Sequence, residues 1–179
     1  TGVQTCALPI SLVTRVRERR SNLGLTVSAT TRAPRKGEVD GVNYFFLTRE
    51  EFDRRVANGE FVEWAEVHGN CYGTLVSEVT SKLASGASLI LEIDVQGALQ
   101  VKERFPEAVL IFIKPPSLEV LRKRLVGRGT ETPETIELRM ANAADELALA
   151  DRYDEVVVND DLDRATDELV RVLDMHERI

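Results

Sequence analysis

The sequence has few cysteines, few histidines and no long apolar run. Its two cysteines, Cys6 and Cys71, are too few for a disulfide framework or a cysteine-rich zinc site, and the two histidines, His68 and His176, stand far apart in the chain. No apolar stretch approaches the roughly 20 residues that cross a bilayer, and the first residues lack the basic flank of a secretory signal. We therefore expect a cytoplasmic protein that contacts no membrane.

An excess of positive charge is also missing. Lys and Arg number 23 against 30 Asp and Glu, which gives a formal net charge of −7. Such a chain has no overall basic field to attract nucleic acid, so we expect no nucleic-acid partner, and a local basic cluster must hold any anionic ligand. The 179 residues, of which 43% are apolar, fit one globular domain with room for a small inserted lobe. The oligomeric state stays open.

The first eleven residues differ from the rest of the chain. Residues 1–11 show neither helical nor strand periodicity, and they stop abruptly where an amphipathic helix is already under way at Leu12. The letters TGVQTCALPI resemble the in-frame translation of a sequencing-library adapter. We interpret residues 1–11 as a non-native segment, with a natural disordered tail as the alternative, and we predict one domain over residues 12–179.

Two patterns follow each other along that domain. A strand at 25–29, a helix that Thr48 caps and Gly59 ends, and an alternating strand at 61–68 predict a small mixed lobe. From Ser88 onward, short apolar strands alternate with helices, which is typical of a parallel α/β sheet. We expect those strands at 89–94, 109–114 and 155–159, and a last helix from about residue 162.

A basic loop follows the first predicted strand. Arg32 and Arg35 offer two planar guanidinium groups three residues apart, and these suit the paired oxygens of a phosphate. Tyr44 and Tyr72 can add hydroxyl donors. The alternative interpretation is a pair of solvated surface arginines.

Two acidic residues break apolar patterns. Glu63 interrupts an alternating strand, and Asp94 ends a strand that is mostly apolar. Ligands of open α/β sheets bind at the carboxyl ends of the parallel strands. Because a buried charge needs a partner, we interpret Asp94 as a functional residue.

A second basic group lies between the last helices. Arg124 ends one helix, glycines flank Arg128, and Arg139 follows on the next helix. Arginines on a mobile loop can close over a nucleotide and stabilise the charge of phosphoryl transfer. Alternatively, Arg139 pairs with Glu134 or Glu137 on its own helix.

Four segments together resemble guanylate kinases: SATTRAPRKGEVDGVNYFF, LEIDVQGA, KPPSLEVLRKRLVGRGTET and VVVNDDLD. The resemblance implies an α/β fold of the P-loop kinase type, with a parallel sheet, flanking helices, an inserted mixed GMP-binding lobe at about 30–86 and a lid at about 126–141. It also implies an enzyme of purine metabolism that transfers the γ-phosphoryl group of ATP to GMP, giving ADP and GDP. Mg²⁺ is expected to accompany ATP, and no residue is expected to bind a metal by itself.

The resemblance also implies roles for individual residues. The expected contacts of the GMP phosphate are Arg32, Arg35, Tyr44 and Tyr72, and those of the guanine ring are Ser28, Glu63, Thr74 and Asp94. The expected contacts of ATP are Arg124, Arg128 and Asn159, and the expected catalytic residues are Arg32, Arg128 and Arg139. Guanine presents N1–H and N2–H donors side by side, which carboxylates can accept, whereas adenine has an acceptor at N1.

One motif of the family is not found among the printed residues. The G-x-x-x-x-G-K-[ST] loop, which holds the ATP phosphates, would stand just before Leu12, where LVTRVRERR resembles the helix that follows it. We therefore expect this polypeptide to bind GMP weakly without turning over ATP. The alternative function is a non-catalytic guanylate-kinase-like module that binds phosphopeptides. Another nucleoside monophosphate kinase fits less well, because the pair of acids suits guanine.

Overall fold

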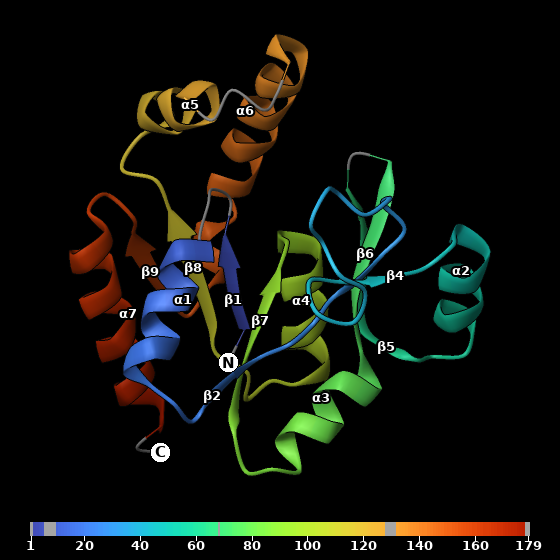
Figure 1. Cartoon of the computed structure of the whole chain (residues 1–179). Coiled ribbons are helices and arrows are strands. Elements are labelled where there is room, and N and C mark those ends of the chain that lie inside the picture. The colour runs from blue at the N-terminus through green and yellow to red at the C-terminus, as the bar shows by residue number, and fades with distance from the viewer. Residues whose placement is uncertain (1, 6–9, 68, 128–131, 178–179) are drawn as a thin grey trace. The chain divides into compact units, whose positions relative to one another are not determined.

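The computed structural model describes residues 2–5, 10–67, 69–127 and 132–177, and these form two compact units (Figure 1). The first unit comprises Thr1–Val3 and Ser21–Ala108. The second unit comprises Gln4–Arg20 and Val109–Ile179. Each unit combines helices with parallel strands, as the sequence predicts.

The first unit contains a small mixed sheet and a parallel strand pair. Its strands are β2 (Leu23–Leu25), β3 (Ala29–Thr30), β4 (Phe45–Phe46), β5 (Phe61–Val67), β6 (Asn70–Leu75) and β7 (Ser88–Ile93), and its helices are α2 (Arg49–Ala57), α3 (Val76–Leu83) and α4 (Val95–Arg104). Strands β2 and β7 pair in parallel, and the other four form a sheet in the order β4-β3-β6-β5.

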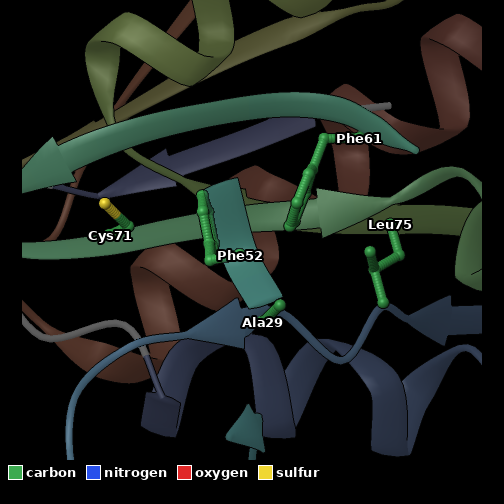
Figure 2. Close-up of a cluster of buried hydrophobic side chains, with 5 residues drawn as sticks. All are labelled: Ala29, Phe52, Phe61, Cys71 and Leu75. Atoms are coloured by element: carbon green, nitrogen blue, oxygen red, sulfur yellow. The ribbon is translucent and has the colours of Figure 1, made fainter. Parts of the chain in front are cut away.

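One face of the four-stranded sheet is apolar. Successive strand residues point to opposite faces, so every second residue of β6 belongs to this side. The cluster on this face consists of Ala29, Phe52, Phe61, Cys71 and Leu75 (Figure 2). Phe52 comes from α2, and its ring centroid lies 4.5 Å from that of Phe61. Helix α2 begins as predicted, because the Thr48 hydroxyl accepts the Glu51 N–H at 3.2 Å.

The opposite face of the same sheet is polar and nevertheless buried. Thr30, Glu63 and Thr74 are 0%, 4% and 0% exposed. Glu63 reaches this face through a β-bulge: Phe61 pairs with Leu75 and Glu63 pairs with Thr74, so β5 has one more residue here than β6. A bulge re-aims the side chains that follow it. This explains why Glu63 breaks the alternation that the sequence shows.

The second unit contains the remaining helices and a parallel strand pair. Its elements are α1 (Ile10–Arg19), β8 (Leu110–Lys114), α5 (Leu118–Gly127), α6 (Pro133–Leu147), the 3-10 helix η1 (Ala150–Arg152), β9 (Glu155–Val158) and α7 (Leu162–Glu177). Strands β8 and β9 pair in parallel. Helices α5 and α6 share a core of Leu121, Leu125, Ile136 and Ala143.

Helices α1 and α7 lie side by side in the second unit and are joined by ion pairs. Arg15 pairs with Asp163, and Arg19 pairs with Asp167. The guanidinium of Arg20, which follows α1, pairs with two acids of α7. Arg15, Arg19 and Arg20 therefore have acidic partners near the other end of the chain.

Some boundaries differ from the sequence-based expectations. The strand expected at 25–29 is two strands, β2 and β3, because the chain passes from one sheet to the other between them. Residues 1–11 were expected to be without regular structure, and this is wrong for Gly2–Thr5, which form β1, and for Ile10, where α1 begins. Four residues are too few for an alternating pattern to show. The interpretation of that segment as non-native stays a prediction.

Among the described helices, none combines the length and the apolar character that crossing a bilayer requires.

Candidate functional site

Two carboxylates converge in the first unit. Glu63 lies on β5 just after the bulge, and Asp94 caps the N-terminus of α4, where Asp94 Oδ1 accepts the Gly97 N–H at 2.8 Å. A Cβ atom on Gly97 would overlap Glu63 Oε2 and would stand 3.4 Å from Asp94 Oδ1. The two predicted acids therefore meet beside Gly97, although 30 residues separate them in the chain.

Burial changes the protonation of both acids. It raises the pKa of Glu63 to about 7; the Thr74 hydroxyl opposes this rise, and the charge of Asp94 adds to it. The pKa of Asp94 is also raised by burial, and the backbone N–H groups of Gly97 and Gln96 partly offset that rise. Burial therefore favours the protonated form of both acids.

Two buried side-chain oxygens beside the acids can still form hydrogen bonds. Thr74 lies near enough to stabilise the Glu63 carboxylate, yet within the described part of the chain neither Glu63 Oε1 nor Thr74 Oγ1 has a hydrogen-bond partner of good geometry. An unsatisfied buried acceptor is costly. The arrangement is therefore suited to accept N–H donors from a ligand.

The basic loop between β3 and β4 is organised around Glu38. The Arg32 guanidinium donates to both Glu38 carboxylate oxygens, at 2.9 and 3.0 Å, which raises the pKa of Arg32. Glu38 also accepts the backbone N–H of Arg35 at 2.6 Å. The hydrogen bond from Arg32 is the main reason why the pKa of Glu38 is lowered. The loop thus holds an anionic group between its two predicted phosphate-binding arginines, and the Arg35 side chain is exposed.

Two tyrosines adjoin this loop. The Arg32 guanidinium carbon lies 5.4 Å from the ring centroid of Tyr44, and the rings of Tyr44 and Tyr72 meet edge to face at 6.2 Å. Burial raises the pKa of Tyr44, so its hydroxyl stays a donor. Tyr72 and Thr74 alternate along β6 and share a face about 7 Å apart, so the basic loop and the acids lie along one side of one sheet.

Ser28 is the remaining predicted contact of the base. It is half-buried between β2 and β3, and its carbonyl accepts the Phe45 N–H at 2.9 Å. This bond ties the segment to β4, and the role of the Ser28 hydroxyl stays a prediction.

The residues predicted to contact ATP lie in the second unit. Arg124 donates to the carbonyls of Asn159, at 2.8 Å, and Asp160, at 3.1 Å, so the structure brings Arg124 and Asn159 together. Arg139 is half-buried on α6. Glu137, one of its two alternative partners, pairs with Arg122 of α5. Arg128 lies outside the described residues.

Three residues at the site were not singled out from the sequence. Glu38 was read as part of a basic loop, although an acid among arginines is a detectable signal. Gly97 and Gln100 follow Asp94 at helical spacing, and only their contacts with β5 show why they matter. A pattern of spacing within α4 cannot reveal which strand the helix meets.

Comparisons with known proteins agree with this geometry. The family model described as "Guanylate kinase" matches residues 11–176. A guanylate kinase of Halalkalibacterium halodurans is 53% identical over 158 residues, covering 88% of this chain and 78% of that protein. A guanylate kinase of Gloeobacter violaceus is 55% identical over 163 residues, covering 91% and 80%. The crystal structure of guanylate kinase from Anaplasma phagocytophilum aligns with a TM-score of 0.80 and 37% identity, covering 97% of this chain and 83% of that chain.

The parallel α/β fold, the buried acids and the arginine loop, together with these matches, define the class of the protein as a kinase. Within that class, the chain belongs to the guanylate kinase family. The expected fold class is thereby confirmed, and the family resemblance noted in the sequence is confirmed with it.

Proposed function

We propose that the first unit binds GMP, and that the activity to which this sequence contributes is transfer of the γ-phosphoryl group from ATP to GMP, with ADP and GDP as products. The observation that carries the proposal is the meeting of Glu63, on β5, and Asp94, at the cap of α4, beside Gly97, with Arg32 in the loop that follows β3 of the same sheet. Family membership supports the same substrates.

The acids suit guanine by their hydrogen-bonding character. Guanine offers adjacent N1–H and N2–H donors, and ionised carboxylates only accept. The unsatisfied Glu63 Oε1 supplies an acceptor, and Thr74, which can donate or accept, lies next to it. Adenine would place its N1 acceptor against a carboxylate, and this arrangement costs a hydrogen bond. The proposed base selectivity follows from this mismatch.

The phosphate of GMP would occupy the basic loop. Arg32 and Arg35 supply charged donors, and Tyr44 and Tyr72 supply hydroxyl groups. Tyr72 at the phosphate site and Thr74 at the base site are ~7 Å apart along β6, and the ribose of GMP would span this distance. This arrangement would hold the phosphate oxygen of GMP that accepts the phosphoryl group. Transfer would then depend on the positioning of the reactants and on stabilisation of the transferred charge.

For the ATP side, we propose Arg124, Arg128, Arg139 and Asn159 as contacts. Mg²⁺ would come with ATP, because Mg²⁺ is usually bound through substrate phosphates with one or two carboxylates. The printed sequence contains no G-x-x-x-x-G-K-[ST] segment. We therefore propose that these 179 residues bind GMP without turning over ATP.

Calorimetric titration with GMP, AMP and a phosphoserine peptide tests the proposal, and a coupled assay for ADP tests turnover. We expect GMP to bind more tightly than AMP and the peptide, and no GMP-dependent ADP release from this polypeptide. Tight peptide binding without nucleotide selectivity would replace the proposal with the phosphopeptide-binding module. ADP release that depends on GMP would contradict only the statement about turnover.

Glu38 gives a further prediction. Because its carboxylate orients Arg32 and also binds the Arg35 backbone, Glu38→Gln should weaken GMP binding by about 2- to 10-fold through lost preorganisation. Guanosine, which lacks the phosphate, should bind with unchanged affinity, and calorimetry with both ligands measures the difference. Tighter GMP binding would show instead that Glu38 competes with the phosphate.

A further inference from the structure

Helix α4 is fastened to strand β5 by contacts on one side of the helix. Close to its N-terminus, Gly97 lies against the carboxylate of Glu63. One turn later, the Gln100 side chain bonds the backbone of Trp64, and one turn after that, Arg104 Nη1 donates to the Phe61 carbonyl at 2.9 Å. Residues three or four apart share a helix face, so these contacts form one row along α4.

Gly97 determines how closely the helix approaches Glu63. A Cβ atom at this position would overlap Glu63 Oε2 and stand 3.0 Å from Glu63 Cδ. Its backbone N–H, meanwhile, holds Asp94 Oδ1. One residue without a side chain therefore holds one acid and leaves space for the other.

Gln100 fixes the backbone that carries Glu63. Gln100 Oε1 accepts the Trp64 N–H at 3.1 Å, and Gln100 Nε2 donates to the Trp64 carbonyl at 2.7 Å. The Trp64 N–H belongs to the peptide group that joins Glu63 to Trp64, immediately after the bulge. Strand β5 lies at the edge of its sheet, so Trp64 turns its N–H and carbonyl away from β6, and the primary amide of Gln100 pairs with both groups.

We propose that Gly97 and Gln100 are positioning residues that set the spacing of the two carboxylates and thereby the preference for a purine carrying a 2-amino group. The proposal rests on the proposed function, since it concerns the same base site. A ligand whose N1–H and N2–H donors lie side by side needs acceptors at a fixed separation. Gly97 controls that separation by binding Asp94 and by leaving space for Glu63. Gln100 controls it by holding the backbone of Glu63.

The experiment compares GMP with IMP, which keeps N1–H and lacks the 2-amino group, and with AMP. Dissociation constants are measured for the unaltered chain, for Gln100→Met and for the control Arg104→Met, which removes a contact between the same helix and strand beyond the bulge. We expect Gln100→Met to reduce the ratio of GMP to IMP affinity by ~10-fold, within the range for loss of one paired base contact. Arg104→Met should keep that ratio. Thermal melting checks that both variants fold.

Two further variants keep the test decisive if Gln100→Met does not fold. Gln100→Glu keeps an acceptor for the Trp64 N–H and loses the donor, so it should lower the ratio less. Gly97→Ala should remove most of the GMP preference by displacing Glu63. An unchanged GMP-to-IMP ratio in the folded Gln100 variants would overturn this inference alone, whereas an unaltered chain that does not prefer GMP to AMP would overturn the proposed function.

Discussion

Replacing Glu63 by glutamine is expected to weaken GMP binding by about 10- to 100-fold and to bring the affinities for GMP and AMP close together. The amide keeps the shape of the side chain, but it offers one acceptor where the carboxylate offers two, and its NH₂ group opposes the guanine donors. Asp94→Asn should act in the same direction. Calorimetric titration of each variant with GMP and AMP measures both effects, and unchanged selectivity would refute the assignment of these acids to the base.

Glu63→Gln should also stabilise the ligand-free protein. Because burial raises the pKa of Glu63 from 4.5 to about 7, the folded protein keeps a proton that the unfolded chain has lost, and the free energy of unfolding falls as pH rises between these values. Above pH 7 the loss amounts to about 3 kcal/mol. Glu63→Gln should recover most of it at pH 8 and remove this part of the pH dependence, as urea unfolding at pH 5 and pH 8 would measure.

The affinity for GMP should depend on pH in the opposite direction to the stability of the ligand-free protein. Only the ionised Glu63 accepts the guanine donors fully, so GMP affinity should fall as pH drops below about 7. Glu66→Gln is a matched control, because Glu66 lies three residues further along β5 and its side chain is exposed. A Glu66 variant that also loses GMP selectivity would mean that charge on the lobe, rather than the position of Glu63, determines base choice.

Replacing Arg32 by methionine is expected to weaken GMP binding by about 10- to 100-fold while leaving guanosine binding nearly unchanged. Arg32 is the arginine whose guanidinium lies against Tyr44 and is held in place by Glu38, so its charged donors are already oriented. Methionine keeps much of the apolar contact with the ring and removes the charge. The difference between the two ligands isolates the phosphate contribution.

The control for this variant is Arg49→Met, since Arg49 lies at the start of α2 and pairs with Asp53 on that exposed surface. It should bind both ligands as the unaltered chain does. Equal losses of GMP and guanosine binding in Arg32→Met would show that Arg32 supports the fold of the lobe rather than the phosphate.

The sequence predicted the elements that contain an apolar run or a clear helix cap. The strands at 88–93, 110–114 and 155–158 and the cap at Thr48 were found within one or two residues, because apolar runs and a hydroxyl cap are local signals. Helix α3 was not predicted, because its eight residues have no buried side chain to form an apolar stripe. The four-stranded order β4-β3-β6-β5 could not be derived either, since it depends on contacts between distant segments.

The candidate site shows the same division. Asp94 was found because a carboxylate at the C-terminal end of a mostly apolar strand is a local signal. The partners that hold the site together were not found: the Glu38 carboxylate between two arginines, the space at Gly97 and the Gln100 amide are tertiary contacts. The roles carried over from the family stay predictions.

The bulge in β5 also determines which residues of this strand face the polar side of the sheet. One additional residue between Phe61 and Glu63 exchanges inside for outside along the rest of the strand, so a glutamate arrives among polar neighbours without any amino-acid replacement. In a regular strand of the same residues, Glu63 would lie on the face of Phe61 and Trp64 would lie among the polar side chains, because successive residues point to opposite faces. The register of a strand, as much as its residue types, therefore determines which side chains line the polar face of this sheet.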